Sequence, residues 1–201
     1  MSGDSIMAMQ PLFQEEDDSS TLISPLHLHL KLIPLQLAYK LYAKWHYLGG
    51  TAFVSSVNFG VLANHEWHGA ISYGPPNATD LAPYWDRTTQ ASWWELKRLA
   101  LSPACQKNSE SRVIAVSIKL LRKMERVQGI VTYADTQQQH TGGIYKATGF
   151  MSLGMTDQKC DYVLNGRIQQ RGPTRHTNGE WIPRSRKWLF VKDFRMKGDQ
   201  P

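Results

Sequence analysis

Two short segments of the chain combine side chains that could move a proton or bind a planar substrate. The first is His46-Tyr47, followed by Leu-Gly-Gly. The second begins at Asp135 and runs through His140 into a Thr-Gly-Gly turn and Tyr145. Imidazole, carboxylate and phenol groups can serve as general acids or bases when a site positions them. A carboxylate at such a place can equally be a turn former, and a lone His a surface residue, so both interpretations stay open here.

A third segment, Asn108–Arg112, opens a predicted helix and could hold phosphate. The first turn of a helix offers unpaired N–H groups and the positive end of the helix dipole. Ser109 and Ser111 add hydroxyls, and Arg112 adds a bidentate cation. The same residue types also fit an ordinary N-terminal capping box, which remains the alternative.

Hydrophobic periodicity predicts the elements that must position these side chains. Alternation and β-branched runs indicate strands, and apolar stripes at helical spacing indicate helices. The predicted strands are 26–33, 51–61, 67–73, 93–101, 129–133, 150–153 and 186–194, and the predicted helices are 36–45, 109–127 and 141–148. In strand 93–101, alternation places Glu95 and Lys97 on one face and Arg98 on the other. Residues 160–183 are polar and are predicted to form turns.

The order of these elements predicts an α+β fold in which a mixed sheet of six or seven strands is flanked by helices. One domain covers residues 26–194. Residues 1–25 carry five acids and no base and are predicted to be a disordered acidic tail, with 195–201 a second tail. Residues 165–201 carry nine bases and three acids, so the end of the domain, 165–194, is a basic segment.

This charge distribution favours a polyanionic partner, although a formal net charge of +6 by itself fits a nonspecific basic surface equally well. Cys105 and Cys160 do not make a disulfide framework, and no Cys/His quartet for zinc is present. No apolar run is long enough to span a bilayer, and no secretory leader is recognisable. We therefore expect a cytoplasmic protein without membrane contact, whose oligomeric state stays open with a dimer as one option.

Several segments occur in an order that resembles the bacteriophage Mom family. They are His46-Tyr47 before two glycines, ELKRLAL at 95–101, NSESR at 108–112, and the segment 133–145 that starts with Tyr-Ala-Asp and ends with Gly-Gly-Ile-Tyr. Mom proteins modify adenine in phage DNA and are similar to GCN5-related N-acyltransferases. The resemblance therefore implies a GNAT-like, mostly antiparallel sheet. It also implies the product N6-(carbamoylmethyl)adenine, which protects DNA from host restriction endonucleases.

The same resemblance implies which residues bind the donor and which react. The cofactor, acetyl-CoA or a related acyl-CoA, would be held by Ser109, Ser111, Arg112 and Arg98. Here QKNSESR replaces the glycine-rich turn of ordinary acyltransferases, so the hydroxyls and the arginine would stand in for backbone contacts. The catalytic residues would be His46, Tyr47, Asp135 and Tyr145.

The implied product also constrains the reaction, because it joins adenine N6 to a CH2 carbon and not to a carbonyl carbon. A site that only stabilises an oxyanion does not activate that carbon. A redox metal is an economical hypothesis, and the Mom family is associated with iron. The candidate iron ligands are His46, Asp135 and His140, which supply imidazole and oxygen donors from distant parts of the sequence.

Adenine N6 is paired and stacked in double-stranded DNA, so such an enzyme would act on a flipped base. Aromatic side chains that could stack on it are Tyr47, Tyr84 and Trp85, and cations that could hold the phosphate backbone are Arg184, Arg186 and Lys187. Two alternatives remain. One is a plain acyl-CoA-dependent N-acetyltransferase acting on a small amine or a protein. The other is a non-enzymatic, basic DNA-binding or anti-restriction protein.

Overall fold

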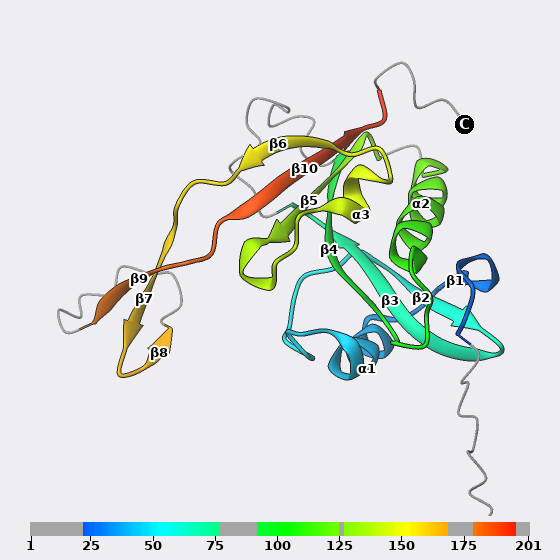
Figure 1. Ribbon diagram of the computed structural model, residues 1–201, viewed down its shortest axis with the longest axis horizontal. Helices are drawn as coiled ribbons and strands as arrows, with labels where there is room; N and C mark the ends of the chain where they lie inside the picture. The colour runs from blue at the N-terminus through cyan, green and yellow to red at the C-terminus, as the bar shows by residue number, and fades with distance from the viewer. Residues whose placement is uncertain (1–21, 77–91, 125–126, 169–178, 196–201) are drawn as a thin grey trace, which may run out of the picture.

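A computed structural model describes residues 22–76, 92–124, 127–168 and 179–195, and Figure 1 shows its arrangement. The main sheet has seven strands in the order β1-β2-β3-β4-β5-β10-β6. Their bounds are β1 His29–Leu32, β2 Val57–Ala63, β3 Glu66–Gly74, β4 Trp93–Leu101, β5 Gly129–Asp135, β6 Met151–Met155 and β10 Lys187–Asp193. The α-helices in the described ranges are α1 Leu35–Trp45, α2 Ser109–Arg122 and α3 Gly143–Lys146. The predicted α+β fold with a mixed, mostly antiparallel sheet is confirmed.

One parallel pair separates the two halves of this sheet. β4 and β5 pair only where Trp93–Glu95 lies beside Gly129–Val131. Beyond that point the two strands diverge, while β4 stays paired with β3 as far as Leu101. Among the described residues, the edge of β4 from Leu96 onward that faces β5 therefore has no strand partner. This wedge-shaped opening in the sheet is where the candidate site lies.

Helices α1 and α2 cover opposite faces of the sheet. α1 buries Ala38, Leu41 and Tyr42, which recur at helical spacing, and packs them against Ala70 and Ala100. α2 buries a second apolar stripe on the other face, formed by Val113, Ile114, Ile118 and Leu121. The sheet is thus held between two apolar layers, which fix the ends of both helices relative to the opening.

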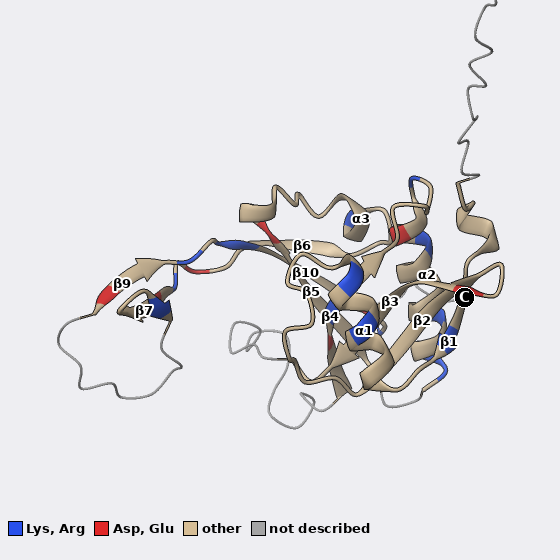
Figure 2. Ribbon diagram, turned by 90° about the horizontal axis from the view of Figure 1, so that it is seen from below, with Lys and Arg blue, Asp and Glu red and all other residues tan. Residues whose placement is uncertain are grey.

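A second, smaller sheet projects from the body of the molecule and is called the arm (Figures 1 and 2). It has the order β8-β7-β9, with β7 at Cys160–Leu164, β8 at Arg167–Ile168 and β9 at Glu180–Pro183. The sequence predicts only turns here, and that prediction misses three strands. All four residues of β9 are exposed, so the arm buries too little to impose an apolar alternation.

The other elements differ from their predicted bounds mainly at the ends. The strand predicted at 26–33 starts later, because Pro25–His27 forms a 3-10 turn ahead of β1. The strand predicted from residue 51 begins at Val57, and the helix predicted to reach residue 127 ends at Arg122. Within the described residues, no helix combines the length and the apolar character needed to cross a membrane.

Candidate functional site

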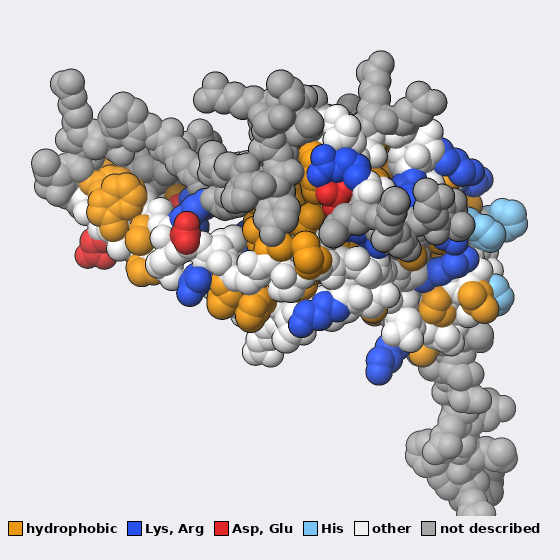
Figure 3. Space-filling model, turned by 90° about the horizontal axis from the view of Figure 1, so that it is seen from above, with side chains coloured by type: hydrophobic (Ala, Val, Ile, Leu, Met, Phe, Trp, Pro, Cys, Tyr) orange, Lys and Arg blue, Asp and Glu red, His pale blue; other side chains and the backbone are white. Residues whose placement is uncertain are grey.

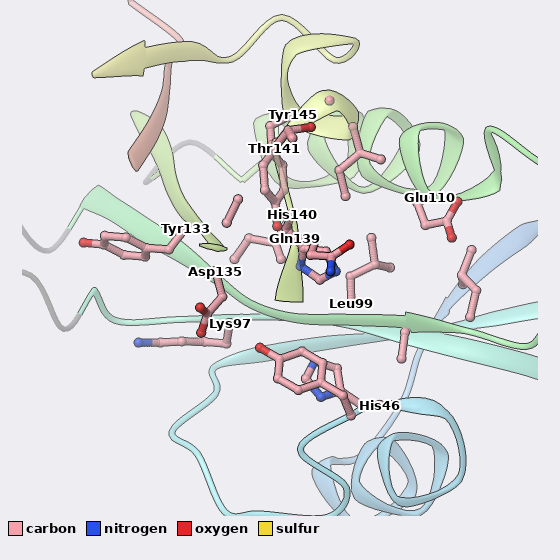
Figure 4. Close-up of a pocket in the computed structure, with 18 of the residues that line it drawn as sticks. His46, Lys97, Leu99, Glu110, Tyr133, Asp135, Gln139, His140, Thr141 and Tyr145 are labelled. Carbon is pink, nitrogen blue, oxygen red and sulfur yellow. The ribbon is translucent and has the colours of Figure 1, made fainter. Parts of the chain in front are cut away.

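A cavity of about 570 Å³ occupies the opening between β4 and β5. Its walls come from the C-terminal end of α1, the unpaired part of β4, the end of β5, and the segment from Gln139 to Tyr145. Figure 4 shows His46 and His140 approaching from opposite sides, with Asp135 and Lys97 beside them. The residues predicted to be catalytic, His46, Tyr47, Asp135 and Tyr145, all line it. Segments far apart in the sequence therefore meet at one site, although their roles remain predictions.

His46 follows the last residue of α1 and lines the cavity as a neutral ring. Its Nδ1 accepts a hydrogen bond from the Leu48 backbone N–H at 3.1 Å. Burial, followed by the positive charges of Arg98 and His140, lowers the pKa of His46 from 6.5 to about 4. A neutral imidazole that accepts at Nδ1 carries its proton on Nε2. His46 is therefore a hydrogen-bond donor at neutral pH.

Tyr47 is the exposed aromatic residue at the rim of the cavity. Its ring stacks on His46 with a centroid distance of 4.5 Å, and it meets His140 edge-on at 6.3 Å. The side chain is 53% exposed. Partial burial, with the charge of Asp135 as the next contribution, raises the pKa of Tyr47, so its hydroxyl stays protonated near neutral pH. Tyr47 offers an aromatic surface to a planar ligand at the mouth.

Asp135 is the last residue of β5, where the strand ends in the opening. Its Oδ1 accepts a hydrogen bond from the Gln137 N–H at 3.0 Å, which caps a 3-10 turn at Thr136–Gln138. Its Oδ2 lies 4.0 Å from the ammonium of Lys187. The turn-former interpretation of Asp135 thus holds for Oδ1, whereas Oδ2 faces Lys187.

Tyr145 and His140 come from the segment that returns from β5 to α3. Tyr145 is buried against Phe150 and Phe190. Burial raises the pKa of Tyr145, so the phenol remains a proton donor. Gly142 caps α3 with a φ of +75° and lies so close to the Phe190 ring that a Cβ would overlap it. This close approach sets where α3, and with it Tyr145, lies on the cavity wall.

The first turn of α2 lies at the other end of the opening. Asn108 precedes it in a left-handed conformation, and no side chain caps the helix, so the capping-box alternative is not what the structure shows. The Ser109 hydroxyl is fully buried without a hydrogen-bond partner in the described structure. Ser111 donates to the Asn108 carbonyl, and Arg112 is exposed. Of this turn it is Glu110, which the sequence analysis did not select, that lines the cavity (Figure 4).

Arg98 is buried on the α1 side of the sheet and is not among the cavity residues. Its guanidinium donates to the Gly49 carbonyl at 3.0 Å and lies 4.5 Å from the centre of the Phe53 ring. These two contacts of Arg98 stabilise the loop that follows His46 and Tyr47. Arg98 was predicted to contact the cofactor, but the structure places it outside the lining of the cavity.

Lys97 lines the cavity and was not assigned a role from the sequence. Its Nζ forms an ion pair with Glu95 Oε2 at 2.8 Å, and the two side chains are only 5% and 11% exposed. The predicted alternation on β4 is confirmed by this pair. A charged pair on one face of a central strand is the sequence signal that could have identified Lys97.

The three predicted iron ligands line the same cavity but do not form a metal site. Among the described residues, no group of three His, Cys, Asp or Glu side chains is placed to hold a metal. His46 Nδ1 and Asp135 Oδ1 already accept backbone hydrogen bonds. The donor set therefore does not fit iron.

The predicted DNA-binding cations lie where the arm joins the body. Arg184 pairs with Asp161 on β7, and Arg186 Nε donates to the Thr156 carbonyl at 2.8 Å. Lys187 begins β10 and faces Asp135 across the strand pair. The other predicted DNA-contacting residues, Tyr84 and Trp85, lie outside the described residues.

Comparison with known proteins gives a family and one curated relative. The family model described as the Mom protein family matches residues 27–192. The methylcarbamoylase Mom of Escherichia phage Mu is 26% identical over 143 residues. That alignment covers 69% of this chain but only 58% of the relative, so the chain matches little more than half of the phage Mu protein's length.

Solved acetyltransferases have a similar fold at low sequence identity. The ribosomal-protein-S5-alanine acetyltransferase from Vibrio fischeri has a TM-score of 0.51 and 16% identity, covering 87% of this chain and 96% of its own. An acetyltransferase from Bacillus subtilis in complex with CoA has a TM-score of 0.51 and 13% identity, covering 83% and 98%. AAC(6')-Ib in complex with ribostamycin and coenzyme A has a TM-score of 0.53 and 13% identity, covering 86% and 99%. These similarities show a shared GNAT-like fold.

Proposed function

Since the chain belongs to the Mom protein family, we propose that it modifies adenine in DNA by transferring a carbamoylmethyl group to N6. The name of the phage Mu relative, a methylcarbamoylase, supports this reaction class. Such a modification would shield the DNA from restriction endonucleases, because these enzymes recognise the base edges that N6 substitution alters.

One observation carries the proposal. The family match covers the whole region that builds the opening, and all four residues predicted to be catalytic line one cavity there. A cavity lined by several titratable groups, one of them with a strongly shifted pKa, is a sound candidate for an active site.

The proposed reaction needs a base, because the adenine amino group is a weak nucleophile. A bond forms between N6 and the CH2 carbon of the transferred group, and the bond from that carbon to the donor's leaving group breaks with its electron pair. The N6 proton passes to Asp135, whose Oδ2 is the oxygen not used by the turn. His46, as a neutral donor, hydrogen-bonds the carbamoyl oxygen. The buried phenol of Tyr145 protonates the leaving group.

The donor would occupy the opening along β4. In the described part of the chain, the edge of β4 that faces β5 has no strand partner beyond Glu95, so an extended donor with amide groups could hydrogen-bond to it as an added strand would. The pantetheine arm of an acyl-CoA could bind in this way, and the first turn of α2 would lie near its phosphates, with the buried Ser109 hydroxyl still lacking a partner. Because the thiolate of an acyl-CoA leaves from a carbonyl carbon, an acyl-CoA bound here would be the donor of a plain acyl transfer, whereas the carbamoylmethyl donor carries its leaving group on the CH2 carbon. The carboxylate of Glu110 would repel the phosphates of the acyl-CoA. The proposed phosphate position therefore depends on the backbone N–H groups in the first turn of α2 and not on side-chain charge.

The acceptor adenine would enter from the Tyr47 side. A flipped base needs an aromatic surface to replace its lost stacking, and the exposed ring of Tyr47, backed by His46, supplies one. Arg186 and Lys187 lie near the same mouth and would contact the phosphates on either side of the flipped nucleotide.

The test is a nucleoside analysis. The chain is expressed in a bacterial host, the host DNA is digested to nucleosides, and deoxyadenosine carrying a carbamoylmethyl group in place of one hydrogen is sought by mass spectrometry. We expect this nucleoside with the wild-type chain and not with Asp135→Asn. Unmodified deoxyadenosine in both would refute the proposal.

The fold of the solved neighbours supports a second candidate, a plain N-acetyltransferase. It predicts that acetyl-CoA is consumed with an amine acceptor in the absence of DNA. The non-enzymatic alternative predicts that neither the wild-type chain nor Asp135→Asn produces modified deoxyadenosine and that both bind DNA with the same affinity. The nucleoside analysis, repeated with acetyl-CoA turnover on amines, separates all three.

A further inference from the structure

The arm has two faces that differ in charge. Directly opposed residues of antiparallel strands share a face, and alternate residues along a strand point to opposite faces. The pairing places Cys160, Tyr162 and Leu164 of β7 on one face with Arg167 of β8 and with Trp181 and Pro183 of β9. The opposite face carries Asp161, Val163, Ile168, Glu180 and Ile182. Both acids of the strands therefore lie on the second face, and the first, called the Trp181 face, has a cation and no acid.

The Trp181 face is largely apolar, and it has a buried residue, Tyr162, at its centre. The exposed residues on this face are Cys160, Arg167, Trp181 and Pro183. Trp181 is 69% exposed, and its ring lies 5.2 Å from that of Tyr162 beneath it. Figure 3 shows hydrophobic side chains on the surface of the arm, at the left of the view. An indole left mostly exposed next to exposed Cys160 and Pro183 makes this side of a projecting sheet a candidate binding surface.

The two segments that connect the arm to the body begin at the rim of the cavity. The two connecting segments are bonded to each other from Thr156 N to Lys187 O and from Arg184 N to Lys159 O, both at 2.8 Å. On the cavity side, the Thr136 hydroxyl donates to the Arg186 carbonyl at 2.6 Å, directly after Asp135. The connection is thus a hydrogen-bonded ribbon that starts at the cavity rim, and Figure 2 shows basic residues along it.

We propose that the Trp181 face of the arm lies against the double-stranded DNA that flanks the adenine presented to the cavity. This rests on the proposed function. A duplex whose base enters the cavity continues past the rim for many base pairs, and the arm projects from that rim. The grooves of DNA accept a β-ribbon, and the acid-free face with Arg167 suits a polyanion better than a second copy of this basic chain.

A first experiment needs no substitution and uses Cys160, which is exposed on the same face as Trp181. The full-length chain is alkylated with N-ethylmaleimide with and without a duplex of about 30 base pairs, roughly three helical turns. Mass spectrometry gives the rate for each cysteine. We expect DNA to slow alkylation of Cys160 severalfold and to leave Cys105, on the body, unaffected. Equal rates for Cys160 with and without DNA overturn the proposal.

A second experiment measures affinity for the same duplex by fluorescence anisotropy. We expect Trp181→Ala to weaken binding roughly tenfold, as loss of an aromatic contact with nucleic acid does, with an unchanged salt dependence because no charge is removed. Trp181→Phe, which keeps an aromatic ring and guards against a misfolded arm, should recover most of the affinity. Leu32→Ala, an exposed apolar residue on β1, is the matched control and should bind as the wild type does. Wild-type affinity in Trp181→Ala refutes the inference.

The outcomes also separate this inference from the proposed function. If the modified nucleoside forms but Cys160 is not protected, the arm inference fails and the proposed function stands. If Cys160 is protected but no modified nucleoside forms, the DNA contact stands and the proposed chemistry fails. If raising the protein concentration alone protects Cys160, the arm is an interface between two copies of the chain and the proposal is wrong.

Discussion

Asp135 is the residue on which the proposed chemistry depends most directly. Replacing it by Asn keeps the hydrogen bond to Gln137 possible through the amide oxygen but removes the base, so the modification rate should fall roughly 100-fold or more. DNA affinity should change little. The rate is measured by nucleoside mass spectrometry and the affinity by anisotropy. Asp193→Asn, at the far end of β10 and paired with Arg195, is the control and should keep full activity. An active Asp135→Asn variant would remove Asp135 from the mechanism.

His46 makes the stability of the protein depend on pH. Its pKa is about 4 in the folded chain against 6.5 as the ordinary value, so the unfolded chain binds more protons between these two pH values. The contribution of His46 to stability should therefore be fully present above pH 6.5 and should be lost as the pH falls toward 4. Thermal melts across this range measure it. His46→Gln, which cannot titrate, should flatten the curve relative to the wild type, and two parallel curves would contradict the assignment.

At the scale of elements, the position of α3 depends on a glycine. Gly142 has a φ of +75°, and an added Cβ would lie 2.1 Å from the Phe190 ring, so Gly142→Ala should cost about 2 kcal/mol or more and displace the cavity wall. Gly143→Ala is a close control, since a Cβ there meets only the Thr141 hydroxyl at 4.0 Å. Urea unfolding of both variants measures the difference. Equal stabilities would show that α3 is not positioned by this contact.

At the scale of the whole molecule, the basic residues at the arm junction should set the salt dependence of DNA binding. Lys187→Ala removes one exposed cation at the mouth, so the slope of log affinity against log salt should become shallower by about 0.9. Lys119→Ala removes an exposed cation from α2 instead and should leave the slope unchanged. Titrations at several salt concentrations measure both. The same slope for Lys187→Ala and the wild type would place the DNA elsewhere.

Local sequence patterns and the order of motifs were enough to predict the fold class, the family and the residues most worth testing. Strand β4 was predicted with its exact bounds, because apolar alternation and a charged pair at Glu95 and Lys97 are local signals. The Mom resemblance is confirmed by the family match over residues 27–192. Four candidate catalytic residues could be selected because imidazole, phenol and carboxylate groups can transfer protons, a property that residue type alone shows. They are His46, Tyr47, Asp135 and Tyr145.

Which of these residues meet, and in what protonation state, depends on long-range packing that local patterns do not encode. The divergence of β4 from β5 creates the cavity, and no local pattern in either strand signals it, since it depends on where pairing stops. The same packing turns Arg98 toward Gly49, brings Glu110 to the cavity and leaves the three predicted iron ligands without a metal geometry. It also forms an arm from a polar segment, whose strands are paired by backbone hydrogen bonds and bury little beyond Tyr162 among the described residues. Side-chain type is written in the sequence, whereas protonation state, orientation and neighbourhood come from long-range contacts.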